Sequence, residues 1–197
     1  MSNVRVKKRN GSIEPMNLEK MHVMVERACS NLAGVSASQV EMQSGIQFYN
    51  GITTDEIQNI LIKSASDLIS LEQPNYQYVA ARLLLFSLRK SLYGKIYEIP
   101  HLKDHIDKCV ENGVYDPAVN DKFTVGEINE IEKFLDHDRD YLFTYAGLRQ
   151  VADKYLVQDR SSGQVYETPQ FMYMLIAMTM FAEYDRGTRL NLSLIHI

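Results

Sequence analysis

The sequence predicts a mainly α-helical protein with a small β-hairpin at its N-terminal end. Three observations support this fold class. Apolar residues recur at helical spacing along most of the chain. Capping boxes, which mark helix N-termini, begin at Ser36, Thr53 and Thr124. Residues 4–9 instead alternate with a period of two and lead into Asn10-Gly11, a pattern typical of a hairpin.

The composition is that of an ordinary globular protein. The chain has 197 residues, 45% of them hydrophobic and 23% charged, and a formal net charge of 21 − 25 = −4. This acidic balance argues against a dedicated nucleic-acid-binding protein. The sequence has neither the roughly 18 apolar residues of a membrane helix nor a signal peptide. Cys29 and Cys109 lack metal-type spacing, so we expect buried thiols in a reducing cytosol.

The hairpin and the start of the first helix follow from local signals. Residues 4–9 form the first predicted strand, and Ser12–Pro15 form the second. Asn10 and Gly11 predict a two-residue type I′ turn, in which both central residues take positive φ. Asn17 is the predicted N-cap of the helix that follows.

This arrangement would deliver three cations, Lys7, Lys8 and Arg9, beside a helix N-terminus. Cations and unpaired N–H groups in one place suit an anion such as a triphosphate. Basic residues on a first strand also protect an exposed sheet edge from aggregation, which on these residues alone is the commoner role. A nucleic-acid arm or an address signal is a further alternative.

Four helices follow the hairpin and should form one compact domain with it. The last of them is apolar on almost every face and should be the most buried. In chain order these helices run from Asn17 to a C-cap at Gly34, from Ser36 to Phe48, from Thr53 to Leu68, and from Pro74 to Lys90.

The second half of the chain is also predicted to be mostly helical, after a connector at residues 94–100. Its elements are helices at 102–111, 124–135 and 141–155, a hairpin pairing 155–157 with 164–166, and a Met-rich helix at 170–182. Residues 192–197 resemble a translated sequencing adapter, so we exclude them as a non-native tail and expect the natural protein to continue.

No catalytic constellation is evident. His101 and His105 stand four residues apart, as in half a metal site, but two solvated helix-start residues are the simpler interpretation. His137 and Asp140 offer an acid–base pair without a nucleophile, so a capping or ion-pair role is the default. The sequence contains neither of the two usual glycine-rich nucleotide-binding motifs, G-x-x-x-x-G-K-[ST] and G-x-G-x-x-G.

Five segments, in order and similarly spaced, resemble the start of a class I ribonucleotide reductase large subunit. They are KKRNGSIEPMNLEKMH (7–22), IQFYNGITTDEIQ (46–58), PNYQYVAARLLLFSLRKSLYG (74–94), DHDRD (136–140) and KYLVQDRSSGQVYETPQFMYM (154–174). The resemblance implies that residues 1–95 form an ATP cone, a four-helix bundle capped by a small β-sheet. It also implies that residues 96–191 form a helical part of the reductase domain that packs on the reductase barrel.

The resemblance implies an effector site for ATP or dATP, with Mg²⁺ and without a covalently held cofactor or a protein metal site. Gln58 and Ser87 stand where tightly dATP-inhibited cones often have histidine, so we expect a weakly inhibited enzyme. The implied site residues are Lys8 and Arg9 at the phosphates, Glu14, Pro15, Met16, Asn17, Leu18, Glu19 and Lys20 around the adenine, Thr54 at a phosphate, and Lys90 from the fourth helix.

For the whole protein the resemblance implies a cytoplasmic ribonucleoside-diphosphate reductase that makes deoxyribonucleotides for DNA synthesis. Its partners would be a radical-generating small subunit and further large subunits, with no nucleic acid or membrane. Its redox-active cysteines would lie beyond residue 190, since Cys29 and Cys109 do not match them, and this chain alone should be inactive. An apolar face at Phe171, Met174, Ile176 and Met180 should then lack its partner.

Two alternatives come from other classes of protein. A DNA-binding regulator that senses nucleotide through a cone should carry a zinc ribbon with four clustered cysteines, which this chain lacks. A stand-alone nucleotide-sensing or helical protein-interaction module without catalysis remains, and failure to bind nucleotide would favour the interaction module.

Overall fold

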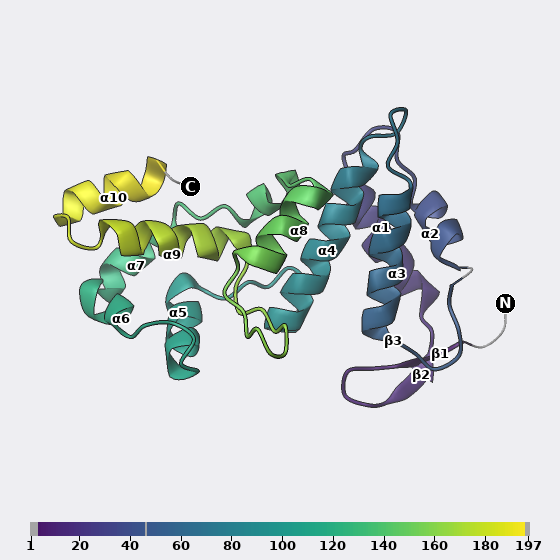
Figure 1. Cartoon of the computed structure of the whole chain (residues 1–197), viewed down its shortest axis with the longest axis horizontal. Coiled ribbons are helices and arrows are strands. Elements are labelled where there is room, and N and C mark those ends of the chain that lie inside the picture. Colours follow the sequence, from purple (N-terminus) through teal and green to yellow (C-terminus); the bar gives the residue numbers. More distant parts are fainter. Residues whose placement is uncertain (1–3, 46, 196–197) are drawn as a thin grey trace. The chain divides into compact units, whose positions relative to one another are not determined.

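The computed structural model describes residues 4–45 and 47–195, and it confirms a mainly helical fold with one small sheet (Figure 1). The chain divides into two compact units. The first comprises Met1–Ser87 and Tyr141–Arg149, and the second comprises Leu88–Asp140 and Gln150–Ile197. The division after Ser87 falls inside helix α4 (Tyr76–Tyr93), which runs unbroken through it, so the domain ranges 1–95 and 96–191 remain predictions. In the described part of the chain, no helix is long and apolar enough to cross a membrane.

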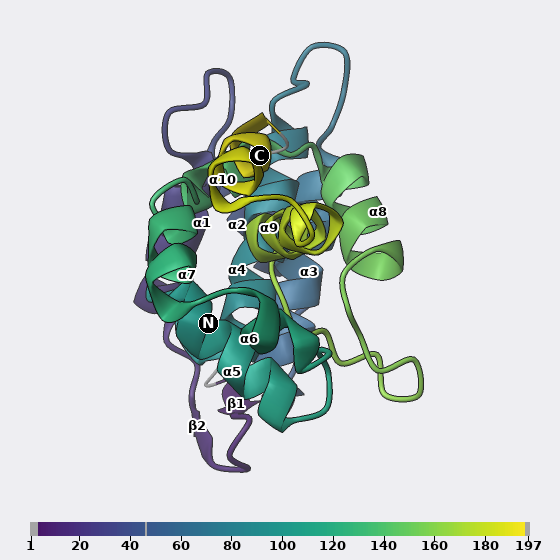
Figure 2. The same ribbon diagram turned by 90° about the vertical axis from the view of Figure 1, so that its left-hand side faces the viewer.

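The first unit is a helical bundle with its sheet at one end. The sheet and its hairpin lie at one end of the helices, and the loops at residues 30–36 and 68–75 lie at the other (Figures 1 and 2). The elements are β1 (Arg5–Lys7), β2 (Ile13–Pro15), α1 (Leu18–Cys29), α2 (Ala37–Gly45), β3 (Ile52–Thr53), α3 (Thr54–Asp67), the start of α4 (Tyr76–Tyr93) and the start of α8 (Tyr145–Lys154).

The sheet contains a third strand that the sequence pattern did not predict. Its order is β2-β1-β3, so β1 is central, antiparallel to β2 and parallel to β3. Val6 is 4% exposed while Arg5 and Lys7 face solvent, as the period-two alternation predicts. The two-residue strand β3 is too short to show any periodicity. Its pairing is supported by Gly51, whose N–H donates to the Arg5 carbonyl at 2.8 Å.

The hairpin turn differs from the predicted type I′ turn. The Lys8 N–H donates to the Ser12 carbonyl (2.8 Å), and the Gly11 N–H donates to the Lys8 carbonyl (2.9 Å), which closes a three-residue loop. Gly11 has φ +84°, whereas Asn10 does not take a positive φ. This is the pattern of a turn followed by one left-handed residue. Asn10 instead accepts hydrogen bonds from the Ser12 N–H and hydroxyl, which explains its presence.

Helix α1 ends earlier than predicted. Its last residue is Cys29, and Asn31 takes the left-handed conformation with φ +58°. Gly34 therefore lies beyond the helix in the following loop, and its prediction as the C-cap is wrong. Asparagine tolerates this conformation better than most residues because its side chain is short and polar. Similarly, α2 ends at Gly45, before the predicted Phe48.

A buried tyrosine takes part in the cap of α2. The Ser36 N–H, which a simple capping box would pair with Gln39, donates to the Tyr76 hydroxyl at 3.0 Å. That hydroxyl in turn donates to the Gln39 side-chain oxygen. Tyr76 is fully buried at the start of α4. The start of α2 is therefore tied to α4 through one hydroxyl group.

The second unit is helical apart from a hairpin-like loop. Helices α5 and α7 match their predicted starts, whereas α6 and the 3₁₀ helix η1 were not predicted. The predicted second hairpin contains a single bridge, between Gln158 and Val165. The elements are the end of α4, α5 (Leu102–Glu111), α6 (Ala118–Lys122), α7 (Val125–Glu132), η1 (His137–Leu142) up to Asp140, the end of α8, α9 (Pro169–Phe181) and α10 (Arg186–Ile195).

Helix α9 lies in the core of the second unit. Phe171 and Met174 are fully buried there, against residues of α5 and α7 such as Ile106. The expectation that these two residues lack a partner is therefore wrong. Ile176 and Met180 are 48% and 63% exposed, as expected for an uncovered face.

Candidate nucleotide site

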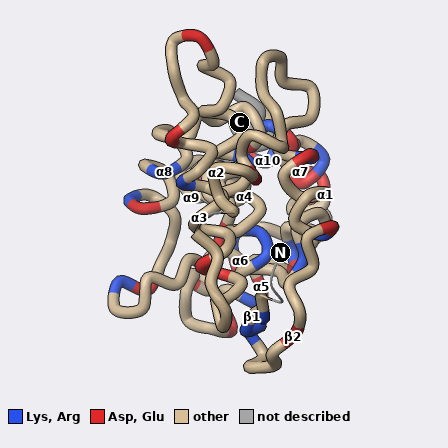
Figure 3. Tube along the Cα trace, turned by 90° about the vertical axis from the view of Figure 1, so that its right-hand side faces the viewer, with Lys and Arg blue, Asp and Glu red and all other residues tan. Residues whose placement is uncertain are grey.

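The register of the sheet decides which helix N-terminus the basic residues approach. β3 runs parallel to β1, with Lys7 opposite Thr53, so the chain leaving β1 passes the first turn of α3. The prediction that the three cations lie beside the start of α1 is wrong. β2 runs antiparallel to β1, so α1 begins at the other end of the hairpin. Figure 3 shows the basic positions of β1 as a blue stretch.

Both predicted phosphate-side cations are paired with carboxylates. The Lys8 ammonium lies 3.4 Å from the Glu14 carboxylate across the hairpin. Arg9 donates to one oxygen of Asp55 from Nε at 2.9 Å and from Nη2 at 2.6 Å. Asp55 was not predicted as a site residue. It is in the first turn of α3, and only the pairing of β3 with β1 brings it to Arg9.

The start of α3 is capped by its own side chains. The Thr53 hydroxyl accepts from the Glu56 N–H, while the Glu56 carboxylate accepts from the Thr53 N–H and hydroxyl, which confirms the predicted capping box. Hydrogen bonds from the Tyr49 hydroxyl and from Thr53 hold the pKa of Glu56 at about 2. Glu56 is therefore ionised at neutral pH and committed to the cap.

Residues 16–20 of the predicted adenine-side segment lie at the other end of the hairpin. Asn17 caps α1 as predicted, accepting from the Lys20 N–H at 2.8 Å. Residues 14–20 are all exposed or half-buried, so a ligand can reach them. Four residue steps separate the Val4–Met16 pairing from the Lys8–Ser12 pairing, about 13 Å at about 3.3 Å per residue. The start of α1 thus lies at the opposite end of the hairpin from Lys8 and Arg9, whereas Glu14 lies across the hairpin beside Lys8.

The remaining predicted residues have different surroundings. Thr54 is the first residue of α3 and is half-buried. Lys90 is exposed in the last turn of α4, in the second unit, so its place beside the nucleotide remains a prediction. Gln58 is buried, and its amide donates to the Leu83 carbonyl at 2.8 Å. Ser87 lies one helical turn after Leu83 on α4.

The other candidate sites are structural. His101 is exposed and bonds Glu132, whereas His105 is buried and its ring stacks on Phe171 at 4.2 Å, so the solvated interpretation is wrong for His105. Among the described residues, no group of three His, Cys, Asp or Glu side chains could hold a metal. Asp140 forms a buried ion pair with Arg89, in agreement with the default role.

The cysteines are free thiols. Cys109 is buried as predicted, while Cys29 is only partly buried. Burial raises the pKa of both thiols to about 11, so both are protonated at neutral pH. Neither is an activated nucleophile.

A cavity of about 820 Å³ lies in the second unit, between the end of α4, α5 and residues 162–166. None of the predicted nucleotide-site residues lines it. Lys90 lines a smaller hollow of about 320 Å³ with residues 94–98. The predicted hairpin residues line neither of these two cavities.

Comparison with known proteins places these elements in a family. Residues 4–91 match the model of the ATP cone domain, and residues 141–192 match that of the ribonucleotide reductase all-alpha domain. The ribonucleoside-diphosphate reductase 1 subunit alpha of Escherichia coli (strain K12) is 49% identical over 189 residues, which are 96% of this chain and 25% of that protein. The alpha subunits of Haemophilus influenzae (46%) and of Enterobacteria phage T4 (48%) cover 94% and 75% of this chain, and 24% and 20% of their own lengths.

A hairpin-capped helical bundle that matches the ATP cone, followed by part of an all-α reductase domain, defines the class of protein. The chain belongs to the ribonucleotide reductase large-subunit family. It spans about a quarter of the length of the curated relatives it matches.

Proposed function

We propose that this chain carries the overall-activity switch of a ribonucleoside-diphosphate reductase, and that its first unit binds ATP or dATP along the β1–β2 hairpin. The phosphates lie at Lys8, Arg9 and Thr54, and the adenine lies over residues 14–20. Lys90 approaches the phosphates from the end of α4. The observation that carries this proposal is the sheet register, which sets Lys7 opposite Thr53 and brings Arg9 to Asp55 in the first turn of α3.

The chemistry of the hairpin suits an elongated ligand with one charged end. Lys and Arg donate charge-assisted hydrogen bonds to phosphate oxygens, and Arg can do so with two N–H groups. Asn17 and the exposed backbone around it offer donors and acceptors suited to the edge of a base. Mg²⁺ accompanies the nucleotide and is held mainly by its phosphates.

Discrimination between ATP and dATP should be weak. The Gln58 amide is engaged with the Leu83 carbonyl inside the bundle, where it is not offered to a ligand. Ser87 presents only a short hydroxyl. We therefore propose an ATP-responsive enzyme that dATP inhibits weakly, and strong dATP inhibition of the full-length enzyme would contradict this.

The test is calorimetric titration of the whole 197-residue chain with ATP and with dATP in magnesium buffer. Saturable binding is expected, weakened roughly tenfold or more by Lys8→Ala and by Lys90→Ala, since each removes a charged hydrogen bond to phosphate. Lys63→Ala is the matched control, because Lys63 is an exposed lysine of α3 that pairs with Asp67 along its own helix. A folded chain that binds neither nucleotide would leave only a packing or partner-contact role.

For the whole protein we propose reduction of ribonucleoside diphosphates to deoxyribonucleotides in the cytoplasm. The partners are a radical-generating small subunit and further copies of the large subunit. The cysteine chemistry belongs to parts of the protein outside this chain, because the thiols of Cys29 and Cys109 are protonated and at least partly buried.

A further inference from the structure

The Arg9–Asp55 pair sets a carboxylate directly against a cation of the nucleotide site. Both nitrogens of one edge of the Arg9 guanidinium donate to the same oxygen of Asp55, at 2.9 and 2.6 Å. The two side chains are 40% and 58% exposed, so a ligand in solvent can reach both. Arginine presents the same donors to a phosphate as to a carboxylate.

Asp55 is not required to cap α3. The adjacent Glu56 and Thr53 already satisfy each other in a complete capping box. Asp55 instead reaches 46 positions back along the sequence to Arg9. The Lys8 ammonium lies 3.4 Å from the Glu14 carboxylate, so each phosphate-side cation of the hairpin faces a carboxylate.

We propose that Asp55 is an intramolecular counter-ion of the nucleotide site, which holds Arg9 until a polyphosphate displaces it; this rests on the function proposed above. Binding is then an exchange, in which Arg9 gives up a carboxylate and takes a phosphate oxygen. The freed carboxylate remains in the first turn of α3, close to the incoming negative charge. Asp55 therefore weakens nucleotide binding and keeps the switch responsive to changes in nucleotide concentration.

The size of the effect follows from exposure. A solvent-exposed ion pair contributes little, and repulsion between exposed charges is screened by salt. We expect Asp55→Asn to tighten binding of ATP, and of inorganic tripolyphosphate, by roughly 3- to 10-fold at low ionic strength. This increase in affinity should become smaller as salt is added, because salt screens the repulsion between the Asp55 carboxylate and the phosphates, which the substitution removes.

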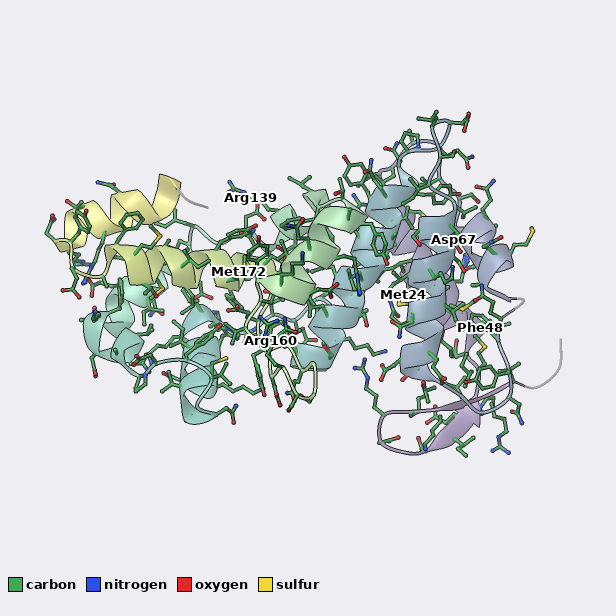
Figure 4. All side chains as sticks on the ribbon, in the orientation of Figure 1. Met24, Phe48, Asp67, Arg139, Arg160 and Met172 are labelled. Carbon is green, nitrogen blue, oxygen red and sulfur yellow. The ribbon has the colours of Figure 1, made fainter. Side chains whose placement is uncertain are left out.

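The experiment is titration calorimetry on the full chain, with ATP and with tripolyphosphate as probes. Asp67→Asn is the matched control, because Asp67 is an exposed carboxylate at the other end of the same helix, paired with Lys63 (Figure 4). It removes the same charge about 18 Å away along α3, at about 1.5 Å per residue, and should leave both affinities unchanged. Thermal unfolding of each variant checks that the fold is retained.

A second comparison separates an effect through Arg9 from a general charge effect. In an Arg9→Gln background, Asp55→Asn should increase the nucleotide affinity less than it does in the wild type, because the Arg9–Asp55 pair is already absent there. Equal gains in both backgrounds would overturn the counter-ion role. A lower affinity of Asp55→Asn for ATP would also overturn the counter-ion role. If that lower affinity appeared only with Mg²⁺ present, it would indicate that Asp55 contacts the metal. If neither the wild type nor Asp55→Asn binds, the proposed function fails as well.

Discussion

His105 is a buried histidine held by a hydrogen-bonded chain in the second unit. Its Nε2 lies 3.0 Å from the Tyr115 hydroxyl, which donates to Glu167 at 2.5 Å, and the other Glu167 oxygen accepts from the Val157 N–H. Because the hydroxyl proton goes to the carboxylate, the hydroxyl must accept from His105 Nε2–H. Burial, with smaller contributions from Lys108 and His137, lowers the pKa of His105 to about 4.

This shift predicts a loss of stability in mild acid. The unfolded histidine has a pKa near 6.5, so between about pH 6.5 and 4 the unfolded state binds more protons, and the free energy of unfolding falls as pH falls. At neutral pH the shifted pKa of His105 should contribute about 3 kcal/mol to the free energy of unfolding, and this contribution is lost in acid. Urea unfolding at pH 7, 5.5 and 4.5 measures it.

The control for this prediction is His105→Phe, which keeps an aromatic ring against Phe171 but cannot be protonated. Burial raises the pKa of Glu167, which acts in the opposite direction in acid, so the difference between wild type and variant isolates the histidine. Parallel pH profiles for the two proteins would contradict the prediction.

At the scale of helices, one side chain can complete the cap of a distant element. The Tyr76 hydroxyl accepts from the Ser36 N–H and donates to the Gln39 side-chain oxygen at the start of α2. Gln39 would reach back to the Ser36 N–H in a simple capping box, as Glu56 does to Thr53 in α3. The start of α2 therefore depends on the packing of α4.

Tyr76→Phe should destabilise the chain by about 1–2 kcal/mol, because it leaves a partly buried N–H and an amide oxygen without their shared partner. Chemical denaturation measures the change. Tyr78→Phe on the same helix is the comparison, since no cap depends on that residue in the described structure, and it should cost less than 0.5 kcal/mol or so. Equal losses in both variants would mean that the hydroxyl bridge contributes nothing specific.

At the scale of the whole chain, the last turns of α4 place a buried charge, Arg89, next to the predicted site residue Lys90. Arg89 is 2% exposed, and its guanidinium donates to the Asp140 carboxylate (3.1 Å) and to the His137 carbonyl (2.5 Å) within the second unit. Burial raises the pKa of Asp140 to about 6, and Arg89 opposes that rise, so the carboxylate is ionised at pH 7. The neighbouring Lys90 is exposed.

Arg89→Met should destabilise the chain by about 3–5 kcal/mol, because it leaves the Asp140 charge buried without its counter-ion. Urea unfolding at pH 7 provides the measurement. Combining it with Asp140→Leu removes both charges and should recover most of the loss. A double variant as unstable as Arg89→Met would show that lost packing, and not the unpaired charge, causes the effect.

The sequence by itself determined the features whose partners lie within a few residues. The capping boxes at Thr53 and Thr124, the Asn17 cap and the burial of α4 all agree with the structure. In each cap, the donor and acceptor are three residues apart, so their chemistry is visible in a short window of sequence. The resemblance to the reductase family likewise rested on local segments in a fixed order.

Only the tertiary structure decided which of these segments meet. Ser36 reaches Tyr76 40 positions away, and Arg9 reaches Asp55 46 positions away. A two-residue strand such as β3 has no period to recognise, and its pairing depends on the bundle that holds its ends. The basic residues after β1 therefore lie beside α3 instead of α1, because strand direction is a property of the assembled sheet and not of any one segment.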